Sequence, residues 1–190
     1  MLMLRKEFNP AVLFLIFALG LMGFWGTALI SAPPAYAEDI EDINFNKYEA
    51  EDFTIHYPDS WELQTEEDQH GKIAVFSEVP GGYPNINIVQ QWDVDMTLSE
   101  YVDFNLAEME GFEGFELKKN EERKLNETEA QEMEFIHDEM YTTLRQRQII
   151  LIDEDDAFVL THTDMEESFA DNIDVFQHIT EEKFEFNPGD

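Results

Sequence analysis

The 190-residue sequence contains no cysteine. This absence excludes disulfide staples, thiolate nucleophiles, zinc–thiolate sites and a lipid anchor on an N-terminal cysteine. Basic residues are also scarce: 11 Lys and Arg stand against 43 Asp and Glu, and the formal net charge is −32. A nucleic-acid partner is therefore excluded, because phosphate binding needs a basic surface that releases counterions. The same charge disfavours adhesion to anionic lipid head groups.

Apolar residues are not scarce. Hydrophobic residues make up 43% of the chain and aromatic residues 13%. An acidic chain without a core would be depleted in both classes. The composition therefore predicts a folded acidic domain and not a disordered acidic tail.

The first 37 residues differ from the rest of the chain. Arg5 and Lys6 precede the apolar run 11–30, and the segment 31–37 ends in the small-x-small pattern Ala35-Tyr36-Ala37. This order predicts a signal peptide over residues 1–37 that is cleaved after Ala37. The alternative is an uncleaved anchor, since the 20-residue apolar run is long enough to span a bilayer. In both cases the basic start places the acidic part outside the cytoplasm, as a secreted or periplasmic protein.

The 153 residues after this segment hold 9 basic and 42 acidic groups, hence a net charge of −33. A chain of that length suits one domain of ordinary size. Residues 38–47 are expected to be a flexible acidic lead-in, residues 48–186 the domain, and residues 187–190 a tail.

The periodicity of the domain predicts strands, a helix, further strands and a second helix. Short apolar alternations separated by turns occupy 48–92, and longer ones occupy 115–163. Thr97 and Glu100 form a capping box for the first helix, and the second helix is expected at about 166–179, before a short strand Phe184–Phe186. The fold class is therefore α+β: an antiparallel sheet in the order meander, helix, second meander, helix, flanked by the helices.

Four segments resemble the PsbP-like superfamily, which includes PsbP and the DcrB-type envelope proteins. They are the opening strand and corner Phe53–Trp61 (FTIHYPDSW), the helix at 97–111 (TLSEYVDFNLAEMEG), the long hairpin at 145–163 and the C-terminal segment 171–186. Lys183 is a departure, because many relatives carry serine there. The resemblance implies an accessory protein without catalytic activity. In phototrophs the members are lumenal proteins that help to retain calcium, chloride and manganese at the oxygen-evolving centre.

Catalytic motifs are absent from the sequence. No serine lies in a Gly-x-Ser-x-Gly elbow, and the five histidines show neither His-x-x-x-His nor His-Glu-x-x-His spacing. The protein is therefore expected not to be an enzyme and to have no cofactor.

One acidic turn is a candidate for weak calcium or manganese binding. It consists of Asp153, Asp155 and Asp156, with Glu154 between them. Calcium takes six to eight oxygen ligands from flexible loops, but the run lacks the spaced Asp-x-Asp-x-Asp-Gly pattern, and a solvated turn is the alternative. A second conceivable metal site uses His137 and Asp138.

Two of the few basic residues lie in one predicted strand. Arg145 and Arg147 alternate onto one face, and Glu132 and Glu134 alternate in the same way in the neighbouring strand. Cross-strand ion pairs between the two sets are expected, and the alternative is that the two arginines contact a partner or an anion.

These features predict a secreted accessory protein that docks on a membrane-associated assembly from the extracytoplasmic side. Its partner is an unknown protein or membrane-protein assembly, and contact with the membrane occurs only through an uncleaved N-terminus. One alternative is a photosystem II extrinsic protein, located in the thylakoid lumen of a phototroph, that influences calcium or manganese retention. The other is a membrane-tethered envelope protein. The charge further predicts adaptation to saline surroundings.

Overall fold

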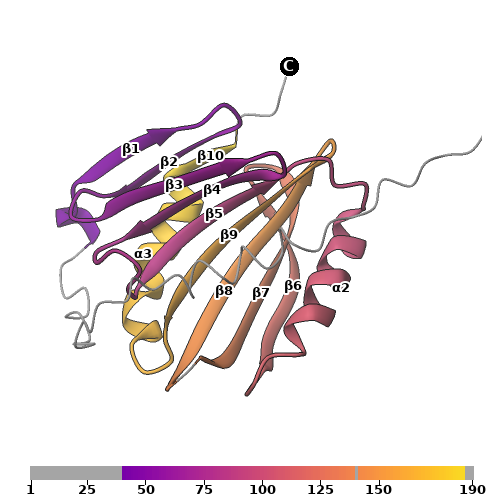
Figure 1. Ribbon diagram of the computed structural model, residues 1–190. Coiled ribbons are helices and arrows are strands. Elements are labelled where there is room, and N and C mark those ends of the chain that lie inside the picture. Colours follow the sequence, from indigo (N-terminus) through magenta and orange to yellow (C-terminus); the bar gives the residue numbers. More distant parts are fainter. Residues whose placement is uncertain (1–39, 140, 187–190) are drawn as a thin grey trace, which may run out of the picture.

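The computed structural model describes residues 40–139 and 141–186, which form two antiparallel sheets and two α-helices (Figure 1). The predicted signal peptide or anchor and the tail 187–190 lie outside the described residues. Within them, no helix is both long and apolar enough to cross a membrane. The α+β class predicted from the sequence is confirmed.

The larger sheet has seven strands in the order β3-β4-β5-β9-β8-β7-β6, and every neighbouring pair is antiparallel. The bounds of its strands are β3 (Glu62–Asp68), β4 (Gly71–Ser77), β5 (Asn85–Gln91), β6 (Glu116–Leu125), β7 (Thr128–Glu139), β8 (Thr142–Asp153) and β9 (Asp156–Met165). The two predicted meanders meet in this one sheet, because β5 of the first pairs with β9 of the second.

The smaller sheet has three strands, β1 (Phe45–Glu49), β2 (Phe53–Pro58) and β10 (Phe184–Phe186), in the order β1-β2-β10. Strand β1 and the 3-10 turn η1 (Ile40–Asp42) occupy the segment for which a flexible lead-in was expected. Ile40, Ile43 and Phe45 pack against the main core. The folded part therefore includes residues 40–47, because this acidic segment carries enough apolar side chains to dock.

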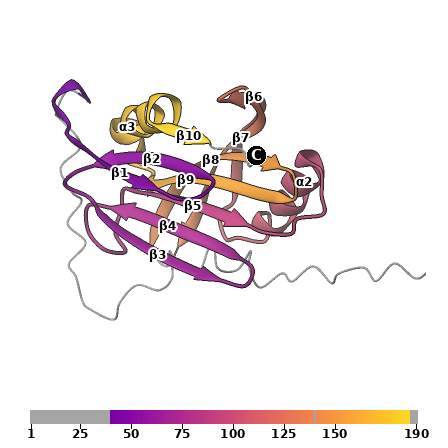
Figure 2. The ribbon, with the colours of Figure 1, turned by 90° about the horizontal axis from the view of Figure 1, so that it is seen from above.

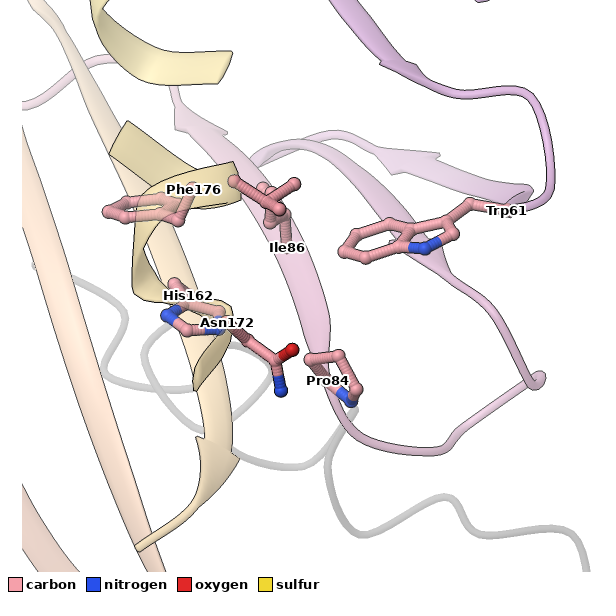
Figure 3. A pocket seen from close by; sticks show the side chains of 7 residues that line it. Trp61, Pro84, Ile86, His162, Asn172 and Phe176 are labelled. Atoms are coloured by element: carbon pink, nitrogen blue, oxygen red, sulfur yellow. The ribbon is translucent and has the colours of Figure 1, made fainter. Parts of the chain in front are cut away.

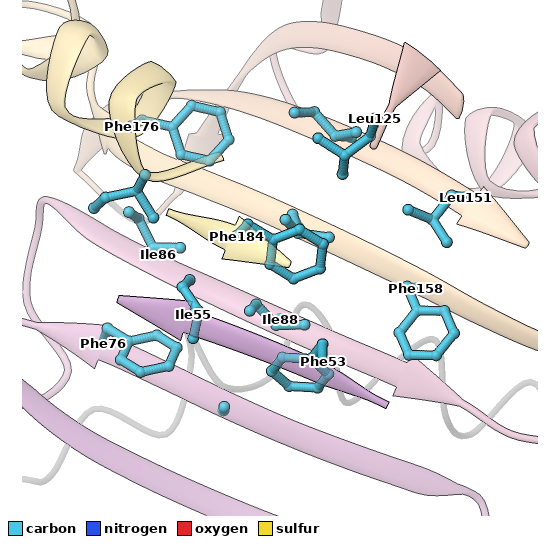
Figure 4. Close-up of a cluster of buried hydrophobic side chains, with 14 of the residues drawn as sticks. Phe53, Ile55, Phe76, Ile86, Ile88, Leu125, Leu151, Phe158, Phe176 and Phe184 are labelled. Carbon is cyan, nitrogen blue, oxygen red and sulfur yellow. The ribbon is translucent and has the colours of Figure 1, made fainter. Parts of the chain in front are cut away.

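Helix α3 (Phe169–Glu182), β2 and β10 cover one face of the seven-stranded sheet (Figures 1 and 2). Their side chains Phe53, Ile55, Phe176 and Phe184 meet the sheet residues in a closed aromatic and aliphatic cluster (Figure 4). Each of these four is at most 2% exposed, and full burial of such a side chain contributes about 1.5–3 kcal/mol. This cluster joins the two sheets into one core.

Helix α2 (Leu98–Met109) packs on the other face of the large sheet through Tyr101, Val102 and Met109. Its predicted capping box is present: Thr97 Oγ1 accepts from the Glu100 amide at 3.3 Å, and Glu100 Oε2 accepts from the Thr97 amide at 2.9 Å. The phenol of Tyr101 donates to Gln91 Oε1 at 3.0 Å. Burial raises the pKa of Tyr101 to about 12, so it is a neutral packing residue.

Candidate functional site

A partly buried group of charges lies on β6, β7 and β8, on the face of the sheet that carries α3. We call Lys119, Arg123, Glu132 and Arg147 the Glu132 cluster. Glu132 Oε1 lies 2.8 Å from Lys119 Nζ and 2.9 Å from Arg147 Nε, and Glu132 Oε2 lies 2.8 Å from Arg123 Nη1. Glu132 and Arg147 are only 4% and 7% exposed. Three cations thus converge on a single buried carboxylate.

The ionisation of Glu132 follows from two opposing effects. Burial disfavours its charged form, but hydrogen bonds from Lys119, Arg147 and Arg123 outweigh burial and hold the pKa of Glu132 at about 2. The hydrogen bond between Lys119 and Glu132 in turn raises the pKa of Lys119. At neutral pH Glu132 is therefore ionised among three cations, and two of these have a second carboxylate: Lys119 Nζ lies 3.4 Å from Glu121 Oε2, and Arg123 Nη2 lies 3.4 Å from Glu181 Oε1.

A second group of ion pairs continues along β8 toward the start of α3. Arg145 donates through Nε to Glu134 Oε1 at 3.0 Å, and its Nη1 lies 3.6 Å from Glu166 Oε1. Both arginines also cover aromatic rings of α3, with Arg145 Cζ 4.7 Å from the Phe169 centroid and Arg147 Cζ 5.8 Å from that of Phe176. Such contacts stabilise a partly desolvated guanidinium.

These contacts confirm the predicted pairing of Arg145 and Arg147 with Glu134 and Glu132. The contributions of Lys119 and Arg123 were missed. Lys119 and Arg123 alternate onto one face of β6, in a stretch whose pairing with β7 is regular. The pattern within β6 does not show which residues of β7 lie opposite, so it could not bring them to Glu132.

His162 lies beside the cluster, fully enclosed between two aromatic rings. Its ring centroid is 4.9 Å from that of Phe169 and 5.2 Å from that of Phe176, and its Nδ1 has no hydrogen-bond partner. Burial, followed by repulsion from Arg147, lowers the pKa of His162 to about 3. The imidazole is therefore neutral at physiological pH and cannot serve there as a general acid.

The same imidazole lines a narrow pocket between α3 and β5 (Figure 3). The pocket has no room for a water molecule, and its lining is mostly apolar: Trp61, Pro84, Ile86, His162, Asn172, Val175 and Phe176. Asn172 is a polar member of this lining, and its Nδ2 donates to Asp164 Oδ2 at 2.6 Å.

Asp164 is fully buried at the entrance to α3. Besides Asn172, its carboxylate accepts from the Met165 amide at 2.7 Å and from Ser168 Oγ at 2.8 Å. Burial raises the pKa of Asp164, although these hydrogen bonds oppose the rise. Ser168 donates to this carboxylate and not to His162, so Asp164, Met165 and Ser168 form the turn that leads into α3. Ser168, His162 and Asp164 therefore do not form a nucleophile–base relay.

The predicted weak metal ligands lie at the β8–β9 hairpin, far along the sheet from α3. Asp153 and Asp156 are register partners, Asp155 is exposed at the turn, and Asp156 Oδ2 accepts from Gln90 Nε2 at 3.0 Å. The Gln90 amide also donates to Asp52 Oδ2 at 2.7 Å. In the described ranges, no three His, Cys, Asp or Glu side chains are grouped so that they could hold a metal ion. Calcium or manganese binding at Asp153, Asp155 and Asp156 stays a prediction.

His137 and Asp138 occupy opposite faces of β7, since they are adjacent in a strand. His137 is buried against Phe112 and Phe135, whereas Asp138 Oδ1 accepts from Thr143 Oγ1 at 2.7 Å. The structure therefore directs these two side chains to opposite faces of the strand.

The fold is an α+β domain of the PsbP/DcrB-like type. A family model described as DcrB matches residues 53–181. The chain belongs to the DcrB family. No curated protein sequence matches it significantly.

Solved structures show the same fold. Cyanobacterial PsbP (CyanoP) from Synechocystis sp. PCC 6803 is similar with a TM-score of 0.56 at 12% identity, over 75% of this chain and 92% of that one. LpqN, involved in cell envelope biogenesis of Mycobacterium tuberculosis, gives 0.51 at 16% identity, over 77% and 92%. PA94, a protein of unknown function from Pseudomonas aeruginosa, gives 0.50 at 14% identity, over 73% and 94%. At these identities the likeness concerns the fold alone.

Proposed function

We propose that this protein is a non-enzymatic envelope protein that docks, through its acidic surface, on a membrane-associated assembly from the extracytoplasmic side. The observation that carries the proposal is that nearly all of its described basic residues are paired with carboxylates of the same chain. Of the nine Lys and Arg that the structure describes, eight lie within 4.0 Å of a carboxylate, namely Lys47, Lys72, Lys118, Lys119, Arg123, Lys124, Arg145 and Arg147. Lys183 lies over the ring of Phe45.

The acidic excess is therefore presented outward. With the bases engaged in these pairs, exposed carboxylates outnumber the cations available to screen them, and the surface field is strongly negative. Such a field attracts a cationic protein surface and repels anionic lipid head groups. The docking partner is accordingly a protein with a basic extramembrane surface.

The interior supports a binding role over catalysis. Each cation of the Glu132 cluster is paired with a carboxylate, His162 is held neutral, and Asp164 is engaged by three donors. An active site needs side-chain groups that are available to a substrate and directed into an accessible cleft. The charged groups described above serve to position strands and α3.

The extracytoplasmic location rests on the predicted signal peptide. If cleavage after Ala37 does not occur, the same domain is tethered to the membrane by the run 11–30. N-terminal sequencing of the mature protein separates the two forms. The photosystem II alternative draws on the likeness to CyanoP, which concerns the fold alone, and the docking proposal does not depend on it.

The experiment that tests the proposal is a binding isotherm. Labelled mature chain (residues 38–190) is titrated onto host membranes and onto protein-free vesicles of the extracted lipids, at low and at high salt. We expect saturable binding to the membranes only, weakening as salt screens the surface charges. Absence of saturable membrane binding at both salt concentrations would falsify the proposal.

A further inference from the structure

Strand β3 forms one end of the seven-stranded sheet, and in the part of the chain that the structure describes β4 is its one neighbouring strand. Figure 2 shows β3 at the rim of the molecule. Six of its seven residues are exposed, with Leu63 half-buried. An edge strand presents a row of backbone N–H and C=O groups with which another strand can pair.

The two ends of this sheet differ. At the opposite end, β6 contains a register shift between Leu117 and Lys119 and carries four basic residues, Lys118, Lys119, Arg123 and Lys124. Bulges and lysines are devices that prevent an edge from pairing with further strands. Strand β3 pairs with β4 without a shift from Glu62 to Asp68 and contains neither proline, glycine nor lysine. Its outer edge is therefore regular over seven residues.

The charges of β3 determine which strand it can accept. Glu62, Glu66, Glu67 and Asp68 lie within these seven residues. Among the described residues, the one cation paired with them is Lys72, 3.6 Å from Glu67. Like charges placed opposite each other destabilise a strand pair, whereas opposite charges stabilise it. The four carboxylates thus disfavour a second copy of β3 and favour a cationic strand.

We propose that the outer edge of β3 binds an extended Lys- or Arg-rich segment of the partner protein, which adds an eighth strand to the sheet. The backbone supplies the hydrogen bonds, and the carboxylates select positive charge. Glu62, Glu66 and Asp68 share one face of the strand, so the partner carries its basic residues at alternate positions. This inference rests on the proposed docking function and names the surface that performs it.

The test uses a peptide probe, acetyl-Lys-Val-Lys-Val-Lys-Val-Lys-Val-amide, titrated onto the mature chain. A fully N-methylated form of the same peptide keeps the charge but has no backbone donors. We expect the first peptide to bind saturably and to slow amide hydrogen exchange in β3, and the N-methylated peptide not to bind. Equal binding of both peptides would show a purely electrostatic contact and overturn the proposal.

Two charge-matched variants locate the contact. The β3 variant is E62Q/E66Q/E67Q/D68N, in which the amide introduced in place of the Asp68 carboxylate retains an acceptor for the turn amides of His70 and Gly71. The α2 variant is D103N/E108Q/E110Q/E113Q, at exposed positions on and after α2. We expect the β3 variant to bind the peptide about tenfold more weakly and the α2 variant to stay within about twofold of wild type. Equal weakening in both would overturn the edge proposal, while saturable binding to host membranes would still support docking.

Discussion

At the residue scale, the side chain expected to contribute most to the stability of the charged cluster is Glu132, a buried carboxylate with three cationic partners. Removing one charge of a buried, paired group leaves the others uncompensated. We expect Glu132→Gln to lower the free energy of unfolding by about 3 kcal/mol, measured by urea denaturation at pH 7. Glu134→Gln is the matched control, because its partner Arg145 keeps Glu166 as a second partner and is more exposed than Arg147. We expect this control to lower the free energy of unfolding by less than about 1 kcal/mol. Equal losses would contradict the central position assigned to Glu132.

His162 predicts how stability depends on pH. Its folded pKa of about 3 lies below its ordinary value of 6.5, so the unfolded chain binds more protons between these values. Stability contributed by His162 is present above pH 6.5 and declines as pH falls toward 3, with a slope of at most about 1.4 kcal/mol per pH unit. We expect His162→Phe to flatten this decline.

The measurement is the free energy of unfolding of both proteins between pH 7.5 and pH 4. At pH 7.5 His162 is neutral in both states, so the difference found there reports packing alone and serves as the internal control. A difference that stays constant down to pH 4 would show that His162 does not titrate with a lowered pKa. Glu132, whose folded pKa is also lowered, adds a loss of stability of the same sign, and this loss falls between its ordinary value of 4.5 and about 2.

At the scale of elements, the helix and strand pattern was largely predictable from the sequence. The capping box at Thr97 and Glu100, the long hairpin of β8 and β9, and the short strand β10 all appear as expected. These are local signals, set by side-chain alternation and by hydrogen bonds within four residues.

The smaller sheet was not predictable in the same way. Phe184 pairs with Ile55 across almost the whole domain, and no local pattern encodes a contact between residues so far apart in sequence. The start of α3 at Phe169, later than expected, has a specific cause. Asp164 binds the Met165 amide and Ser168 Oγ, and this turn holds the chain out of the helix until Phe169.

The cap of α2 gives a prediction at this scale. Thr97→Ala removes the side-chain acceptor of the Glu100 amide, and loss of such a cap costs about 1 kcal/mol of stability. Ser99→Ala, at an exposed position two residues later, is expected to change the free energy of unfolding by less than about 0.5 kcal/mol. Equivalent effects in the two variants, measured by urea denaturation, would argue against a stabilising capping box.

At the scale of the whole molecule, the net charge of −32 has two consequences. The Lys and Arg side chains form ion pairs within the domain, and the remaining carboxylates repel one another across the surface. Added salt screens this repulsion, because the Debye length falls to about 3 Å at 1 M. We expect the melting temperature to rise by about 4–8 °C between low salt and 1 M KCl, as for a gain of about 2 kcal/mol in a domain of this size.

Calorimetry of the mature chain checks this expectation, and the eight-site variant that combines the β3 and α2 substitutions is the control. Because it carries fewer surface charges, its melting temperature should respond less to salt. A melting temperature of the wild type that is independent of salt would contradict the expected adaptation to saline surroundings.

The central claim is that exposed carboxylates, and not the interior charges, bind the partner assembly. The most direct test compares the affinity for host membranes of the wild type, the eight-site surface variant and Glu132→Gln, at a temperature at which all three are folded. The account predicts that the surface variant binds at least about tenfold more weakly and that Glu132→Gln binds like the wild type. Unchanged binding of the surface variant, or a selective loss in Glu132→Gln, would contradict it.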